Sequence, residues 1–151
     1  MDILLDTNIL LIYLRGNEKS RNLEKEIGLL SQGDKVAVSA VSVGEIQSIA
    51  IQNKWGVKRI TLLNEILKKF IVVGINFKAI LDKYAEIDAY SQGKLPQNKG
   101  AFTARNMGKN DLWIAATASV LNIELITTDL DFTHLDKTFC KLRIIERKQY
   151  Q

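Results

Sequence analysis

The chain has 151 residues, 46% of them hydrophobic and 25% charged, which is ordinary for a globular protein and enough for one core. Its single cysteine, Cys140, excludes an internal disulfide, and its single histidine, His134, excludes a zinc site built on several His or Cys ligands. No apolar run is long enough to span a bilayer, and the N-terminus lacks the pattern of a signal peptide. We therefore expect a single cytoplasmic domain over residues 1–151, with no membrane partner and with His134 at the surface or in a loop.

The predicted elements alternate between strands and helices. In chain order the pattern predicts a strand (2–5), a helix (7–15) closed by Gly16, a helix (18–31), a strand (35–39), two helices (42–53, 57–69), a strand (71–75), a helix (77–91), a loop (93–108), a helix (110–121) and two strands (124–127, 142–146). This alternation favours an α/β fold, a three-layer α/β/α sandwich with a mainly parallel five-stranded sheet.

Acidic residues recur near the ends of predicted strands and the starts of the helices that follow them. They are Asp6, Glu45, Asp111, and the pair Asp129 and Asp131. In a parallel sheet the carboxyl ends of the strands share one edge, where ligands bind. Carboxylates gathered there repel one another unless a cation neutralises them, and an oxygen-rich site suits Mg²⁺ or Mn²⁺. The spacing therefore predicts a metal site, and a metal site favours phosphate chemistry.

Taken singly, each acid has a local structural explanation. Asp6 could cap the helix that follows it. Glu45 ends the run Ser42-Val43-Gly44-Glu45, which fits a capping box. Asn110 or Asp111 could cap a helix, and the pair Asp129 and Asp131 could close a turn. The argument for a metal site rests on all of them falling at the same predicted edge.

Four motifs, in order and spacing, resemble those of the PIN-domain family and most of all its VapC-type toxins: Leu4-Leu5-Asp6-Thr7-Asn8, Ser42-Val43-Gly44-Glu45, Asn110-Asp111-Leu112-Trp113-Ile114-Ala115-Ala116 and Thr127-Thr128-Asp129-Leu130-Asp131-Phe132. The resemblance covers nearly the whole chain. It implies a small α/β/α domain, a divalent metal, endoribonuclease activity on RNA and a small antitoxin protein that blocks the site. On the matching positions Asp6, Glu45 and Asp111 are the central acids, Asp129 is the fourth and more variable acid, and Thr127 is a neighbouring hydroxyl residue.

The expected reaction is hydrolysis of RNA phosphodiester bonds. Asp6 and Asp111 would bind Mg²⁺ or Mn²⁺ directly, and Glu45 and Asp129 would complete the site, one of them orienting the attacking water. Flanking substrate contacts are expected from three residues: Thr127, Arg105 and Lys109. The role of Asp131 and the choice between one ion and two stay open.

Other functions fit parts of the pattern. The same metal chemistry could act on DNA or on structured nucleic acid, and an inactive PIN scaffold could bind RNA or protein. A phosphoacceptor signalling domain resembles the acidic sheet edge, but its third strand leads into an Asp, and here that strand runs into Ile75-Asn76-Phe77. A homodimer through Trp55 and Phe70 is a further expectation, although both residues are equally suited to a core.

Overall fold

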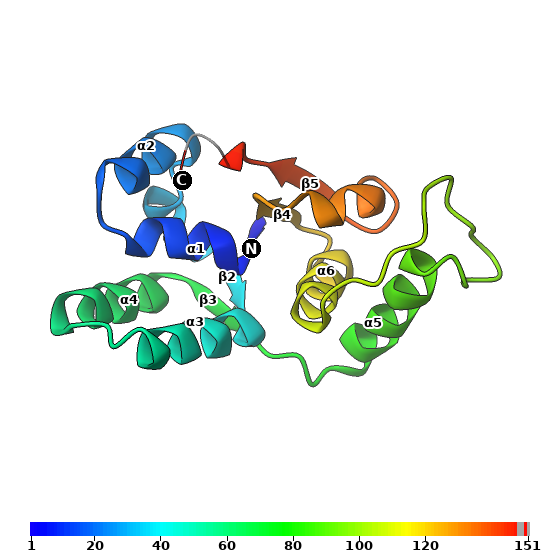
Figure 1. The fold of residues 1–151 in the computed structure, drawn as a ribbon, viewed down its shortest axis with the longest axis horizontal. Coiled ribbons are helices and arrows are strands. Elements are labelled where there is room, and N and C mark those ends of the chain that lie inside the picture. The colour runs from blue at the N-terminus through cyan, green and yellow to red at the C-terminus, as the bar shows by residue number, and fades with distance from the viewer. Residues whose placement is uncertain (148–149, 151) are drawn as a thin grey trace.

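A five-stranded, all-parallel sheet forms the centre of the protein, with strand order β3-β2-β1-β4-β5 (Figure 1). The computed structural model describes residues 1–147 and Tyr150, and of residues 32–34 it describes the backbone alone. The strands are β1 (Ile3–Leu5), β2 (Val36–Ser39), β3 (Ile71–Val73), β4 (Glu124–Thr127) and β5 (Lys141–Ile144). The expected α/β class and five-stranded sheet are confirmed.

The chain enters the sheet at its centre. From β1 it moves outward to β2 and β3 and then returns to the other side of β1, where it adds β4 and β5. Leu5 at the end of β1 pairs with Val38 of β2 and with Ile126 of β4. The strand order thus reverses between β1 and β4, and in open parallel sheets the ligand site lies outside the strand ends at such a reversal.

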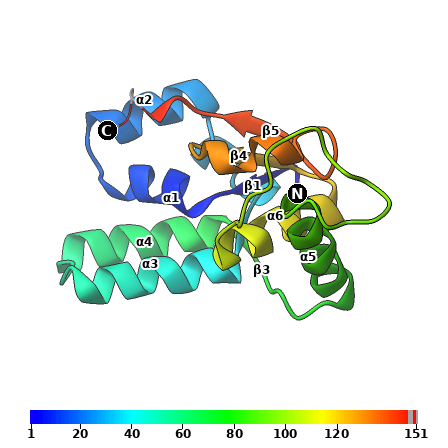
Figure 2. The ribbon, with the colours of Figure 1, turned by 45° about the vertical axis from the view of Figure 1, so that its right-hand side comes forward.

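Helices cover both faces of the sheet (Figures 1 and 2). One face carries α1 (Thr7–Leu14), α2 (Glu18–Ile27), the 3₁₀ helix η1 (Leu30–Lys35), α3 (Ala40–Gln52) and α4 (Val57–Lys69). The other face carries α5 (Lys78–Ser91), α6 (Lys109–Leu121) and the 3₁₀ helix η2 (Leu130–Leu135). This arrangement is the expected three-layer sandwich.

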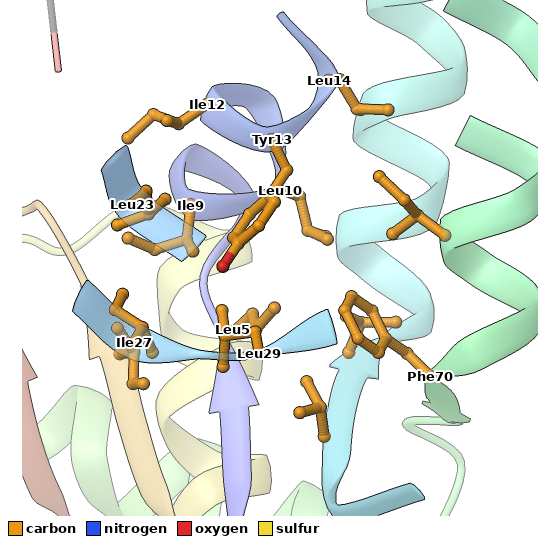
Figure 3. Packing of buried hydrophobic residues seen from close by; sticks show 14 of the residues in the cluster. Leu5, Ile9, Leu10, Ile12, Tyr13, Leu14, Leu23, Ile27, Leu29 and Phe70 are labelled. Atoms are coloured by element: carbon orange, nitrogen blue, oxygen red, sulfur yellow. The ribbon is translucent and has the colours of Figure 1, made fainter. Parts of the chain in front are cut away.

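Successive residues of the central strand face opposite cores. Ile3 and Leu5 pack with α1 and α2, whereas Leu4 between them packs with α5 and α6. In the first core, α1 lays Ile9 and Leu10 over the end of β1 (Figure 3). Because both faces are buried, the strand reads as an unbroken apolar run, as expected for a parallel sheet.

The second helix ends earlier than predicted. It stops at Ile27 instead of residue 31, because Gly28 adopts a left-handed conformation (φ 68°) and donates its N–H to Glu24 O. The Glu24 carboxylate then accepts the N–H of Leu30 (3.0 Å) and the hydroxyl of Tyr13 (2.6 Å). Apolar periodicity alone could not show this break, since Leu30 still packs against the same core.

The aromatic residues suggested for a dimer interface belong to the fold instead. Phe70 is 5% exposed and lies in the first core (Figure 3), so its expected role in a dimer is wrong. Trp55 packs partly against the same core, with the Arg59 guanidinium 5.1 Å from its ring centroid.

The connection from α5 to α6 is irregular, as predicted for residues 93–108. It is held at two places: Arg105 donates its N–H to Ser91 O (2.8 Å), and Phe102 packs on Tyr90 with ring centroids 5.0 Å apart. Within residues 1–147 and Tyr150, no helix combines the length and the apolar character needed to cross a membrane.

A matched pair of helical isoleucines tests this account of the core. Ile9 in α1 is fully buried and Ile51 in α3 is 79% exposed. We expect Ile9→Ala to lower the unfolding free energy by about 2 to 4 kcal/mol, because it leaves a cavity, and Ile51→Ala to change it by less than about 0.5 kcal/mol. Urea unfolding measures both, and equal effects would contradict the core assignment.

Candidate active site

Asp6 is the most buried of the candidate acids, at 3% exposure. It follows β1 and occupies the N-cap of α1, where its Oδ1 accepts the N–H of Thr7 (2.7 Å). Its Oδ2 accepts the hydroxyl of Thr127 (2.6 Å), which ends β4. Asp6 therefore does cap its helix, but the cap uses one oxygen and the second is tied to the neighbouring strand.

Glu45 reaches the same edge from α3, without the capping role predicted for it. The helix begins at Ala40 with Ser39 as its N-cap, so Ser42 and Glu45 lie inside the helix and the expected capping box is wrong. The Thr7 hydroxyl donates to Glu45 Oε1 (3.1 Å) and lies 2.9 Å from the Ser42 hydroxyl. Glu45 is thus oriented across the site, towards α1.

Asp111 approaches from the opposite face of the sheet. It lies in the first turn of α6, whose N-cap is Gly108 and has no side-chain cap bond, so the capping role suggested for Asn110 or Asp111 is wrong. A hollow of about 460 Å³ separates the first turn of α6 from α3, and its lining includes Glu45, Asp111 and Lys109.

Asp129 and Asp131 follow β4. The Asp129 N–H donates to Thr127 Oγ1 (2.9 Å), and Asp129 Oδ1 accepts the N–H of Asp131 (2.8 Å), which caps η2. Asp129 is half-buried, whereas the Asp131 side chain is exposed. Both close a turn as expected, and Asp129 stands directly beside the bond between Thr127 and Asp6.

The acids share one uncompensated negative field. Burial raises the pKa of Asp6 to about 6, with smaller contributions from the charges of Asp129 and Glu45, while its bonds from Thr127 and Thr7 act in the opposite direction. Burial also raises the pKa of Asp111 to about 7, followed by repulsion from Asp6, Asp129 and Glu45. No lysine or arginine of the described residues forms an ion pair with Asp6 or Asp111.

The donor set fits a hard divalent cation. Carboxylate and hydroxyl oxygens are the ligands that Mg²⁺ and Mn²⁺ prefer, and a cation would relieve the repulsion that raises both pKa values. Over residues 1–147 and Tyr150, however, no three His, Cys, Asp or Glu side chains are grouped as closely as the ligands of one ion. The acids line one edge and do not form a closed cage.

The three expected substrate contacts have different surroundings. Lys109 is exposed beside Asp111. Arg105 is half-buried and donates to the carbonyl oxygen of Asp131 (3.5 Å). Thr127 is fully buried, and its hydroxyl donates to the Asp6 carboxylate.

His134, predicted at the surface or in a loop, lies in the short 3₁₀ helix between β4 and β5. It is half-buried in η2, with Nε2 2.7 Å from Ser91 Oγ and its ring 5.0 Å from that of Phe102. Burial, and then the charge of Arg105, lowers the pKa of His134 to about 4. These contacts attach η2 to α5.

Two hydroxyl residues of the site were missed in the sequence, Thr7 and Ser42. Both are buried, at 5% and 0% exposure, and the Thr7 hydroxyl lies within hydrogen-bond distance of both Ser42 and Glu45. The available signal was spacing, since Ser42 precedes Glu45 by three residues and therefore shares its face of a helix.

The PIN-domain family model matches residues 3–138, and the chain belongs to this family. PIN domains are generally nucleases and typically use divalent metal ions. A search of curated proteins found no match.

Among solved structures, the chain is similar to one from VapBC2 of Rickettsia felis bound to a promoter DNA fragment, with 21% identity, 95% of this chain and 98% of that chain covered, and a TM-score of 0.72. A chain of VapBC-1 from nontypeable Haemophilus influenzae gives 22% identity, the same two coverages and a TM-score of 0.70. A chain of FitAcB from Neisseria gonorrhoeae gives 24% identity, coverages of 93% and 95%, and a TM-score of 0.66. These similarities confirm the fold.

The raised pKa of Asp111 predicts how metal-free protein responds to pH. The Asp111 carboxyl binds its proton more tightly in the folded protein than in the unfolded chain. The folded protein therefore loses stability as the pH rises from the pKa of the unfolded chain, near 4, to the pKa of the folded protein, about 7. In EDTA, the wild type should lose roughly 1 to 2 kcal/mol of unfolding free energy between pH 5 and pH 8 relative to Asp111→Asn, a figure reduced for partial exposure of the carboxyl.

The comparison with Asp111→Asn is needed because His134 acts in the opposite direction. The lowered pKa of His134 makes the stability of the folded protein rise with pH between about 4 and 6.5. This histidine is present in both the wild type and Asp111→Asn, so its effect cancels in the comparison. Urea unfolding at a series of pH values gives the two curves. Curves that run parallel from pH 5 to pH 8 would contradict the assigned environment of Asp111.

Proposed function

We propose that this chain is a Mg²⁺- or Mn²⁺-dependent endoribonuclease, acting as the toxin of a toxin–antitoxin pair. The observation that carries the proposal is that Asp6, Glu45, Asp111 and Asp129 lie at one edge of a PIN-domain sheet. No cationic side chain of the described residues is paired with Asp6 or Asp111, whose pKa values are raised. Such a site favours a bound cation and a substrate rich in phosphate.

Asp6 and Asp111 would hold the ion, with Glu45 and Asp129 completing the site. When bound, a divalent ion supplies Lewis acidity, lowering the pKa of water and offsetting charge on phosphoryl oxygens. Each Asp6 oxygen already accepts one hydrogen bond and has a further lone pair available for the ion.

The protein's own contribution is orientation. Thr127 fixes Asp6 from β4, and Thr7 fixes Glu45 from α1. A carboxylate held in one rotamer by such bonds can accept a proton from water in a defined direction, which suits Glu45 or Asp129 as the group that orients the attacking water. Buried hydroxyls in these positions keep the carboxylates in place without adding charge.

The charge distribution supports a polyanionic substrate. The net charge is +4, from 21 basic and 17 acidic residues, and with the four site acids set aside the remainder carries 21 − 13 = +8. Lys109 beside Asp111, and Arg105 beside Asp131, are placed to contact phosphates that flank the cleaved bond.

An antitoxin partner is proposed from the similar solved structures, several of which are toxin–antitoxin complexes. An unpaired acidic site invites a cationic side chain. An arginine of the inhibitor, placed among Asp6, Glu45 and Asp111, could bridge two carboxylates and compete with the metal.

Cleavage assays test the proposed activity. Metal-free protein with a defined single-stranded RNA should be inactive in EDTA and active with Mg²⁺ or Mn²⁺. Asp6→Asn and Asp111→Asn should each lower kcat/KM by at least about a hundredfold, since each removes a ligand charge. Asp82→Asn is the matched control, because Asp82 is an exposed acid of α5 paired with Lys78.

The same assay includes a DNA strand of identical sequence. Cleavage of the DNA strand and not of the RNA would mean that the protein is a deoxyribonuclease and would contradict the proposed substrate. Full activity of the metal-free protein in EDTA, or wild-type turnover by Asp111→Asn, would contradict the proposed site.

The partner is tested by purification from the native host followed by identification of any small co-purifying protein. We expect that protein to inhibit cleavage and to lower the affinity for Mn²⁺. Replacing the inhibitor's arginine that contacts the acids with alanine should restore both cleavage and Mn²⁺ affinity, because the bridging charge is lost. An inhibitor that leaves Mn²⁺ affinity unchanged would contradict a direct contact with the acids.

A further inference from the structure

A hollow of about 710 Å³ lies beside Asp129, separate from the one that contains Glu45 and Asp111. We call it the Arg147 hollow. Its walls come from α1, from the turn after β4 and from the end of β5, and they include Asn8, Thr128, Asp129, Leu130, Ile144 and Arg147. This volume is in the range of sites that bind small molecules or single nucleotides.

One wall of the Arg147 hollow is apolar and exposed. Leu130, in the first turn of η2, is 65% exposed, and Ile144, the last residue of β5, is 36% exposed. A single exposed leucine has no special meaning. Two such side chains inside one hollow, next to a charged site, provide apolar surface that the face of a nucleobase can cover.

Arg147 supplies a positive charge to the lining of the hollow. It is exposed, and among the described residues it forms no ion pair. It also lines a smaller hollow of about 170 Å³ with Arg15 and Asn8. Among the described residues that line the Arg147 hollow, Arg147 is the one basic side chain, and three acids, Asp129, Asp131 and Glu146, line it as well.

The backbone around Arg147 is anchored on both sides. Before it, Ile145 donates its N–H to Thr127 O (2.9 Å) at the end of β4. After it, Tyr150 donates its N–H to Arg147 O (3.0 Å). Tyr150 is itself 4% exposed, with its carbonyl bonded by Arg15 and its hydroxyl by Glu26. The carbonyl of Arg147 and the N–H of Ile145 thus both take part in backbone hydrogen bonds.

We infer that the Arg147 hollow binds the nucleotide next to the cleaved bond of a single-stranded RNA. Its base lies on Leu130 and Ile144, and its outer phosphate pairs with Arg147. This inference rests on the proposed function for the position of the cleaved bond. The hollow shares Asp129 with the candidate active site, so a strand whose cleaved phosphate lies at the acids can place its next nucleotide there.

Binding of a fluorescent eight-nucleotide single-stranded RNA tests the inference. All variants are made in an Asp111→Asn background with Mg²⁺ present, so that binding is measured by anisotropy while cleavage is slow. Arg147→Ala should raise Kd about five- to tenfold and lower the slope of log K against log salt by about 0.7, since one phosphate contact is lost. Arg147→Lys, which keeps the charge, should keep the slope.

Leu130→Ser should raise Kd severalfold and leave the salt slope unchanged, because an apolar contact releases no counterions. Matched controls lie at the far end of α3 and α4: Arg59→Ala removes a charge, and Val57→Ser removes an apolar side chain that is 85% exposed. Both controls should bind within about twofold of the parent. Thermal unfolding checks that every variant is folded.

The inference is overturned if Arg147→Ala and Leu130→Ser bind RNA like their controls. It is also overturned if they keep RNA binding and lose affinity for a co-purifying protein, since the hollow then receives that protein. Wild-type cleavage is measured separately. RNA binding that depends on Arg147 in a protein without ribonuclease activity would uphold the hollow and reject the proposed function.

Discussion

The hydrogen bond from Thr127 to Asp6 joins the ends of β4 and β1, the two neighbouring strands between which the strand order reverses. Its partners are 121 residues apart in sequence and both are buried. Asp129 bonds to the same Thr127 hydroxyl, and Thr7, next to Asp6, bonds to Glu45. The Thr127 hydroxyl therefore takes part in two hydrogen bonds of the candidate site, and losing that hydroxyl would release Asp6 and Asp129 together.

The site is placed there at a cost in stability. Asp6 and Asp111 are carboxyls whose pKa values are raised by burial and, to a smaller extent, by the charges of neighbouring acids, so the fold makes their charged forms less favourable than in water. An acid with only a structural role is commonly paired with a basic side chain, as Asp82 is with Lys78 on α5. Strain of this kind is expected where a ligand completes the charge balance.

The sequence predicted the features that depend on local pattern. The buried runs around Leu4 and Leu125 indicated strands of a parallel sheet, and the strand order then places Asp6 and Asp129 at one edge. Features that depend on contacts distant in sequence were missed. The bond from Thr7 to Glu45 spans 38 residues, and no periodicity within either segment indicates it.

Helix ends were the other source of error. The second helix ends at Gly28 because the backbone turns left-handed there, although the apolar stripe continues to Leu30. The third helix starts at Ala40, two residues before Ser42, the serine predicted as its cap, because Ser39 at the end of β2 caps it instead. That shift removed the structural explanation of Glu45 and strengthened its functional one.

The most direct test of the account is the number of protons released when the metal-free protein binds Mn²⁺. Isothermal titration in two buffers of different ionisation enthalpy measures it. With Asp111 at a pKa of about 7 and Asp6 at about 6, binding at pH 6.5 should release about one proton, and binding at pH 8.5 almost none. Mn²⁺ binding without proton release at pH 6.5, or equal binding by a protein carrying Asp6→Asn and Asp111→Asn, would contradict it.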